Sequence, residues 1–152
     1  SMQIRGARPD DRVFIETLGK RTVMDSVSAG RRPEPASVLE SYDRLLEIVE
    51  SQSHAIYIAE VADERAGFLL MLDQLPDEVT GEPQAFIAYM AVELRFRGAG
   101  IGAALLQRAE DEARQRNLPY MALMVTEENA PARALYERAG FVTERRLLCK
   151  AL

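Results

Sequence analysis

Apolar residues recur every three or four positions in four stretches of the chain, which is the spacing of an amphipathic helix. The boundaries of these stretches carry helix signals. Pro9 opens the first stretch, Asn129 is a suitable N-cap for the last, and Gly140 is a suitable stop after it. The pattern therefore predicts helices over residues 10–27, 36–51, 101–116 and 130–139.

Runs of apolar and β-branched residues bounded by turn residues indicate the strands. Residues 54–61 and 67–72 are two such runs with a short polar connection between them, which is typical of a hairpin. The run AFIAYMAV, residues 85–92, is almost unbroken and predicts a strand buried on both faces of a sheet. Three further strands are expected at residues 3–8, 120–126 and 141–152.

The order of these elements indicates the fold class. Residues 85–126 combine a strand, a glycine turn, a helix and a second strand, which is a βαβ crossover between parallel strands. The hairpin adds antiparallel strands to the same sheet. We therefore expect an α/β (α+β) fold with a mixed sheet. A chain of 152 residues matches about one domain, so a single domain over residues 2–152 is expected.

Composition and charge narrow the range of functions. Hydrophobic residues make up 47% and charged residues 28% of the chain, as in ordinary folded proteins. The formal net charge of −5 argues against nucleic acid as the main partner and suits a positively charged or amine substrate better. A single cysteine and a single histidine argue against a disulfide framework and against a metal site.

The sequence indicates neither a membrane segment nor a secretion signal. No apolar run approaches the roughly 20 residues of a membrane span, and the first residues lack a basic and apolar signal segment. We therefore expect a cytoplasmic protein without a membrane partner. The oligomeric state stays open between a monomer and a homodimer, because apolar strand ends suit a core and an interface equally.

The most distinctive stretch is residues 92–117, where a strand end turns through clustered glycines into a helix. Arg95 and Arg97 precede the glycines, and no carboxylate follows before Glu110. Glycines let backbone N–H groups approach a ligand, and the first N–H groups of a helix have no internal partner. Together with the helix dipole, they favour an anion such as a phosphate. The stretch predicts an anion cradle around Gly98, Gly100 and Gly102.

Two other interpretations of the glycine turn stay open at this point. The first is a tight strand-to-helix turn that binds no ligand. The second is a dinucleotide fingerprint through Gly98, Gly100 and Ala103, with Glu127 as the ribose-binding acid, which would indicate a nucleotide-dependent oxidoreductase. Dinucleotide folds begin with this turn, whereas here about two-thirds of the chain precedes it, so the topology disfavours the second interpretation.

Four separated segments share a pattern with one known family. They are the strand AYMAV, the R-x-x-G-x-G sequence that ends at Gly102, the N-x-x-A-x-x-L-Y sequence from Asn129 to Tyr136, and the tripeptide Ala139-Gly140-Phe141. With these segments the chain resembles the GNAT family of acetyl-CoA-dependent N-acetyltransferases. The resemblance implies a mostly antiparallel mixed sheet of about six to seven strands flanked by about four helices, and acetyl-CoA as co-substrate.

The resemblance also implies how acetyl-CoA is held. Backbone amides of the cradle would bind the coenzyme A pyrophosphate, in agreement with the physical interpretation above. Strands 85–92 and 120–126 would splay apart, and the backbone near Met90 and Val92 would bond the pantetheine and polarise the thioester carbonyl. The implied cofactor-binding residues are Met90, Ala91, Val92, Arg97, Gly98, Ala99, Gly100, Ile101, Gly102, Ala103, Asn129, Ala132 and Tyr136.

For the chemistry, the resemblance implies a general acid but no base. Tyr136 matches the tyrosine that donates a proton to the leaving thiolate, and a phenol with a pKa of about 10 is protonated at neutral pH. Packing of its ring on the sheet is the alternative role. The position of the family's glutamate base is Phe86 here, so the base stays unassigned. Weaker candidates for it are Asp73, Glu82, Tyr89 and Glu128.

Two other reactive side chains are interpreted as structural. His54 begins a strand next to a helix end, where we expect a structural hydrogen bond. Cys149 is expected to be a small core residue rather than a nucleophile, because nothing near it in the sequence would lower the pKa of its thiol.

The predicted activity is acetyl transfer to a primary amine of a small molecule, an amino acid or a peptide, by direct attack in a ternary complex. We expect loops 26–35 and 73–83 to wall the acceptor site, with a cation attracted by acids of the second loop. The absent glutamate leaves open a second hypothesis, a non-catalytic acyl-CoA-binding or sensing module. The acids of loop 73–83 that would attract this cation are Asp73, Asp77, Glu78 and Glu82.

Overall fold

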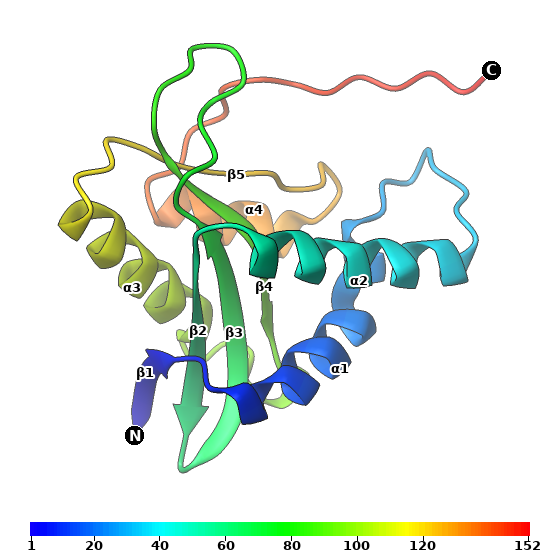
Figure 1. Ribbon diagram of the computed structural model, residues 1–152. Coiled ribbons are helices and arrows are strands. Elements are labelled where there is room, and N and C mark those ends of the chain that lie inside the picture. Colours follow the sequence, from blue (N-terminus) through cyan, green and yellow to red (C-terminus); the bar gives the residue numbers. More distant parts are fainter.

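The computed structural model describes residues 1–152 and contains one five-stranded sheet with helices on both faces (Figure 1). The strands lie side by side in chain order, and all neighbours are antiparallel except the parallel pair β4 and β5. The mixed, mostly antiparallel sheet that the sequence predicted is confirmed. The strands are β1 (Met2–Gly6), β2 (His54–Val61), β3 (Glu64–Leu72), β4 (Ala85–Val92) and β5 (Met121–Leu123).

Two helices cover each face of the sheet. On one face, Leu18 of the first helix and Leu46 of the second are buried with Phe68 of β3. On the other face, Leu105 of the third helix is buried with Leu69, the next residue of β3. None of the helices combines the length and apolarity that crossing a lipid bilayer requires. The helices are α1 (Arg12–Thr22), α2 (Pro35–Ser51), α3 (Ile101–Gln115) and α4 (Ala130–Arg138).

A buried carboxylate ties the start of α1 to β1 and β3. Asp11 is 0% exposed, and both of its oxygens accept hydrogen bonds from Arg5, at 2.8 and 2.9 Å. Arg65 of β3 and the backbone N–H of Arg8 donate to it as well, at 2.7 and 2.6 Å. The bonds from Arg5, and after them those from Arg65 and Arg8, hold the pKa of Asp11 well below its ordinary value in spite of its burial.

The end of the chain differs from the sequence-based expectation. β5 covers three residues instead of 120–126, and residues 141–152 form no strand, so the sheet has five strands rather than six to seven. No backbone group of residues 142–152 bonds to another part of the chain. A run with strand composition becomes a strand only where a neighbour satisfies its backbone groups. Composition identified the run but could not supply that neighbour.

Candidate active site

Strands β4 and β5 separate after a short paired segment. They pair only at Ala85–Met121, Phe86–Ala122 and Ile87–Leu123. β4 then continues through residues 88–92 with β3 on one side and no strand on the other. The two strands therefore splay as the resemblance implied, and the gap opens toward the residues that lead into α3.

The backbone of β4 turns its polar groups alternately toward β3 and toward this gap. The N–H of Glu93 donates to the carbonyl of Ala66, next to β3, at 2.8 Å. Backbone direction alternates along an antiparallel pair, so the polar groups of Ala91 also face β3, whereas those of Met90 and Val92 face the gap. Two residues of β4 thus offer the backbone groups that an added extended chain requires.

The glycine turn exposes six consecutive amides. Gly98 and Gly100 adopt φ of 83° and 82°, and Gly100 is the N-cap of α3. The N–H groups of residues 98–103 find no acceptor within the protein, and a Cβ built on either glycine would meet no atom within 4 Å. The six amides lie at the positive end of a 15-residue helix, and the turn is open at Gly98 and Gly100. The cradle therefore fits an anion such as a phosphate.

The two arginines before the cradle differ in their freedom. Arg95 forms an ion pair with Glu64 at 2.7 Å, and its guanidinium lies over the ring of Phe96, 4.4 Å from the centroid. Arg97 is exposed and forms no ion pair. The first turn of α3 carries no acid. Arg97 is therefore the unpaired positive charge next to the glycine turn in the chain, a distinction that the sequence did not provide.

Gly102 lets three elements meet beside the gap. A Cβ at this position would lie 2.9 Å from Cδ2 of Leu135 on α4 and 3.5 Å from Cε of Met90 on β4. The N-terminus of α4 is fixed by Asn129, whose Oδ1 accepts a bond from the N–H of Ala132 at 3.3 Å. Gly102 thus has a packing role in addition to its predicted role in the anion cradle. Because Leu135 lies against Gly102, α4 lies beside the splayed strands, and Tyr136 follows Leu135 in this helix.

The Tyr136 side chain has the protonation state that a general acid needs. It is half-buried, and its ring packs edge-on against Phe141 with the ring centroids 5.9 Å apart. Burial, and then the neighbouring Tyr89, raise the pKa of Tyr136 above its ordinary value. The phenol is therefore protonated at neutral pH and able to donate. Tyr136 also packs against the core cluster that includes Leu69 of β3, so the alternative role, packing on the sheet, stays open beside the acid role.

Tyr89, a candidate base from the sequence, is held in its neutral form. Its hydroxyl oxygen lies 2.8 Å from Oγ1 of Thr22, and its ring stacks on Phe68. Burial raises the pKa of Tyr89, and the charge of Asp25 adds to the shift. A neutral phenol does not accept a proton readily at neutral pH. The sequence did not indicate that Thr22 and Asp25 lie near Tyr89. The helical pattern predicts that α1 ends near these residues, but it does not show what they contact.

Loop 26–35 lies against the residues that follow β5. Oγ1 of Thr126 donates to the carbonyl of Ser26 at 2.6 Å, and the carboxylate of Glu128 accepts from the N–H of Ala29 at 2.9 Å. These bonds hold loop 26–35 against the residues after β5, and its role as a wall of the acceptor site stays a prediction. They also occupy Glu128, another candidate base.

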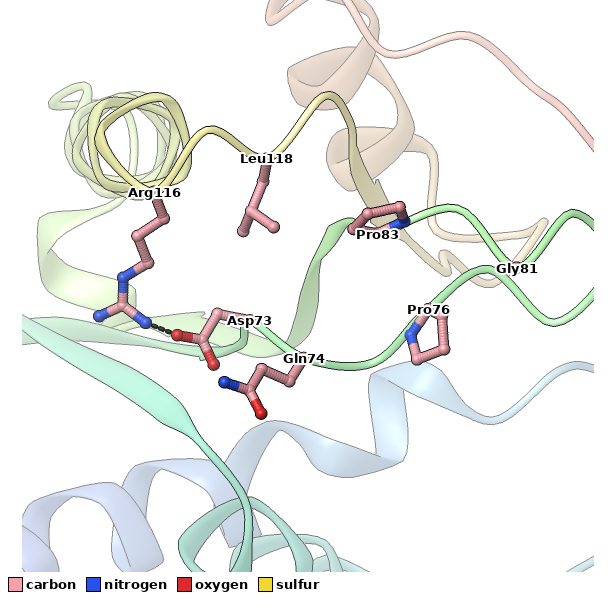
Figure 2. Close-up of a pocket in the computed structure, with 7 residues that line it drawn as sticks. All are labelled: Asp73, Gln74, Pro76, Gly81, Pro83, Arg116 and Leu118. Atoms are coloured by element: carbon pink, nitrogen blue, oxygen red, sulfur yellow. Dashed lines mark ion pairs between the residues drawn. The ribbon is translucent and has the colours of Figure 1, made fainter.

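Loop 73–83 lines a separate cavity of about 390 Å³ at the opposite end of β4 from the cradle (Figure 2). Asp73, expected in an exposed loop, is 7% exposed and forms an ion pair with Arg116 beyond α3. Asp77 pairs with Arg145 at 2.5 Å. The expectation of an exposed Asp73 was therefore wrong. Three of the four acids in this loop already have cationic partners, because Glu78 also pairs with Arg145, at 3.9 Å.

The structural interpretations of His54 and Cys149 have different outcomes. Nδ1 of His54 lies 2.7 Å from the carbonyl of Gln52, so the expected structural hydrogen bond is confirmed. Cys149 is exposed, so its expected place in the core was wrong. No group of three or more His, Cys, Asp or Glu side chains is arranged to hold a metal ion.

The model of one protein family, described as acetyltransferase (GNAT) family, matches residues 24–141. The chain belongs to this family, and the resemblance inferred from the four sequence segments is confirmed. The matched range contains β4, the glycine turn, α3 and α4, which are the elements that build the site.

Individual relatives agree with this assignment. A mycothiol acetyltransferase from Beutenbergia cavernae is 43% identical over 83 residues, which are 53% of this chain and 27% of that enzyme. This chain spans less than half the length of the mycothiol acetyltransferases that it matches. A protein from Pyrococcus furiosus described as an acetyl transferase has the same fold over 100% of both chains, with a TM-score of 0.85 and 25% identity.

A more distant solved structure shares the fold as well. It is an aminoglycoside N-acetyltransferase in complex with CoA, which is 17% identical and aligns over 100% of this chain and 95% of that chain with a TM-score of 0.72.

Proposed function

We propose that the protein transfers the acetyl group of acetyl-CoA to a primary amine by direct attack in a ternary complex. The observation that carries this proposal is the junction of the gap between β4 and β5 with the free amides of residues 98–103. The gap has room for an extended chain that bonds to β4, and the amide N–H groups at its mouth can donate to phosphate oxygens. Membership of the acetyltransferase family supports the same co-substrate.

Each part of acetyl-CoA has a partner in this proposal. The amides of residues 98–103 and the side chain of Arg97 bind the pyrophosphate. Met90 and Val92 bond the pantetheine through the backbone groups that face the gap, with Ala91 between them bonded to β3. The start of α4, at Asn129 and Ala132, lines the far side.

Acetyl-CoA supplies an activated acyl group, and the residues of this chain orient it and handle the proton. A backbone N–H of β4 that faces the gap polarises the thioester carbonyl. The amine nitrogen bonds to the carbonyl carbon as the bond between that carbon and sulfur breaks. Tyr136 protonates the departing sulfur, and the amine releases its proton to solvent, from which Tyr136 is reprotonated.

Solvent takes the role of the base in this mechanism. Phe86 occupies the position of the family's glutamate and packs into the cluster of α1 and α2, so it offers no carboxylate. Water beside Thr22 and Tyr89 accepts the amine proton, and the charge of Asp25 favours its departure. The acceptor must therefore enter with a substantial fraction of its amine deprotonated, and turnover rises with pH as that fraction grows.

A small molecule with a primary amine is the acceptor class that we favour over an amino acid or a peptide. The net charge of −5 and the unpaired acids Asp25 and Glu82 favour a cationic molecule. The relatives named for mycothiol and aminoglycoside acetylation support the same class.

Release of free thiol from acetyl-CoA by the purified protein tests the proposal, with a panel of primary amines as acceptors. We expect release that depends on the amine. Tight binding of acetyl-CoA without amine-dependent release from any acceptor would contradict an enzyme and favour the acyl-CoA-binding module that the absent glutamate suggests. Binding of a nicotinamide nucleotide that coenzyme A does not displace would instead support the oxidoreductase.

A further inference from the structure

The cavity beside loop 73–83 contains a buried acceptor without a partner. The side chain of Asp73, directly after β3, is 5% exposed, and its Oδ2 pairs with Arg116. Its Oδ1 is the only buried side-chain oxygen or nitrogen of the chain that forms no hydrogen bond. Figure 2 shows this second oxygen turned away from Arg116, toward the side of the cavity on which the Gln74 carboxamide lies. A buried acceptor without a donor is unfavourable, so a ligand that donates to Oδ1 gains a hydrogen bond there.

The charge around this oxygen favours a cationic donor. Two carboxylates share the guanidinium of Arg116, because its Nε also bonds to Glu112, at 2.9 Å. The Tyr57 hydroxyl donates to the other oxygen of Glu112 at 3.2 Å. The three charged side chains therefore carry one net negative charge. No group of His, Cys, Asp or Glu side chains is arranged to hold a metal ion, so the donor that fits is an organic ammonium or guanidinium group.

The other walls of the cavity suit a short alkyl chain. Leu118 lines it from the segment between α3 and β5, and Pro76 and Pro83 line it from the loop (Figure 2). The volume of about 390 Å³ is in the range of small-molecule sites. A carboxylate at one end and apolar side chains beside it match a molecule with a cationic head and an alkyl tail.

We propose that this cavity binds a small organic cation. Its ammonium or guanidinium group donates to Oδ1 of Asp73, and its alkyl part lies against Leu118 and the two prolines. The binding energy comes from a charge-assisted hydrogen bond in a place with little solvent, together with burial of the alkyl part. The proposal does not depend on the proposed catalytic function.

The cavity lies apart from the proposed acetyl-transfer site. Pro83 precedes β4 and Leu118 precedes β5, so both flank the end at which these strands are paired. Met90 follows Ala85 by five residues on β4, which at about 3.3 Å per residue separates them by about 16 Å. A molecule bound at Asp73 cannot bring its nitrogen to a thioester held at Met90. The bound cation is therefore an effector rather than the acetyl acceptor.

The effector contacts segments that fix the paired end of the gap. The N–H of Ala85 bonds to the carbonyl of Tyr120 at 2.9 Å, between the residues that line the cavity and the first paired residues of β4 and β5. A molecule that joins Pro83 and Leu118 braces this end. Because it binds the folded chain, it is expected to raise the midpoint of thermal unfolding.

Calorimetric titration of the full chain with n-butylguanidinium tests the proposal. This probe stays cationic at neutral pH and is a poor acetyl acceptor, so its binding is measured apart from any turnover. We expect saturable binding of one molecule per chain. The neutral molecule n-butylurea has nearly the same shape and is the control ligand. It is expected to bind at least about tenfold more weakly, because it lacks the charge that Asp73 pairs with.

A first pair of variants tests the role of Asp73. Asp73→Asn is expected to weaken binding of n-butylguanidinium about tenfold. Glu78→Gln removes the same charge from an 83% exposed side chain of the same loop, and should change the dissociation constant less than about twofold. Equal losses in the two variants would show that only the charge of the loop attracts the probe, and would contradict a site at Asp73.

A second pair of variants avoids the ion pair of Asp73 with Arg116. Gln74 is exposed, so its replacement leaves the folded chain intact, which circular dichroism verifies. Gln74→Lys tethers an ammonium group beside Asp73 and is expected to abolish binding of n-butylguanidinium. Gln74→Met has a similar length without the charge and is expected to retain binding. Undiminished binding to Gln74→Lys would contradict the proposal even if Asp73→Asn failed to fold.

Nuclear magnetic resonance locates the bound probe directly. Addition of n-butylguanidinium is expected to shift the amide signals of Gln74, Gly81 and Leu118, and to leave that of Tyr89 unchanged. A shift at Tyr89 instead would place the probe in the acceptor region and contradict the effector site. Absence of saturable binding, or equal affinity for n-butylurea, would also overturn the proposal. None of these outcomes bears on acetyl transfer, which thiol release measures separately.

Discussion

The sheet is closed on one side of β4 and open on the other. From β1 to β4 the strands pair along most of their lengths, and Asp11 with its two arginines joins this half to α1. Between β4 and β5 only three residues of each strand pair, and the amides of the following glycine turn have no acceptor. In the first half, the backbone N–H and C=O groups bond to one another within the sheet. In the second half, several of these groups are free to bond to a ligand.

This difference separates stability from binding. A backbone group that is paired within the sheet cannot bind a ligand, whereas the groups of Met90, Val92 and the cradle can. We therefore expect changes in the closed half to alter the free energy of unfolding, and changes in the open half to alter binding and turnover with little effect on folding.

Loss of the buried carboxylate is expected to have the largest effect. Asp11→Asn leaves the guanidinium groups of Arg5 and Arg65 without their shared anion, and should lower the free energy of unfolding by about 3 kcal/mol. Chemical denaturation of the parent protein and the variant measures this change in the free energy of unfolding. Asp10→Asn, at an adjacent carboxylate whose side chain is 68% exposed, is the control and should cost less than about 0.5 kcal/mol. If both variants lowered the free energy of unfolding equally, the assignment of stability to the closed half would be contradicted.

Tyr136→Phe is expected to reduce turnover about 100-fold, because the departing sulfur loses its proton donor. The dissociation constant for acetyl-CoA and the free energy of unfolding should change little. Steady-state kinetics and calorimetric titration measure the two quantities. Tyr57→Phe removes a hydroxyl that bonds to Glu112 outside the site, and serves as the control. A Tyr136→Phe enzyme with parental turnover would contradict the acid role and leave only the packing on Phe141.

Acid should weaken the closed half before it affects the ligand-binding half. The pKa of Asp11 is lower in the folded protein than in the unfolded chain, so its stabilising contribution is complete above the unfolded value of about 4 and is lost as pH falls below it. Between about pH 5 and pH 2 the loss should be on the order of 2 kcal/mol from this group. Denaturation of the parent and of Asp11→Asn across this range measures it, and the variant should show a flatter profile. Parallel profiles would contradict the assignment.

The smallest expected effect separates the two arginines of the cradle. Arg97→Ala should raise the dissociation constant for coenzyme A about fivefold, as for an exposed charge pair worth about 1 kcal/mol, and the effect should shrink in high salt. Arg95→Ala should change it less, because Glu64 already pairs with this side chain. Calorimetric titration at two salt concentrations compares them. A larger loss for Arg95→Ala would reverse the roles assigned to the two arginines.

Local patterns in the sequence were sufficient for most elements of the fold. The run at residues 85–92, the glycine turn and the Asn129 cap each carry their signal within a few residues, and β4, α3 and α4 follow them closely. Local patterns were also sufficient to identify the family, because its four sequence segments are short and each can be recognised separately.

Features that depend on distant neighbours were not readable in advance. Asp73 is buried because Arg116 lies beside it, 43 positions later in the chain, and Thr22 joins the site because β4 carries Tyr89 to it. Cys149 and its segment have strand composition, yet they are exposed because no strand of the sheet pairs with them. The sequence by itself determined the elements, the family and the position of the cradle, through periodicity and residue type over short spans. Only the tertiary structure decided which charges are paired, which backbone groups are free and which strand lacks a partner, because each of these depends on contacts between residues far apart in the chain.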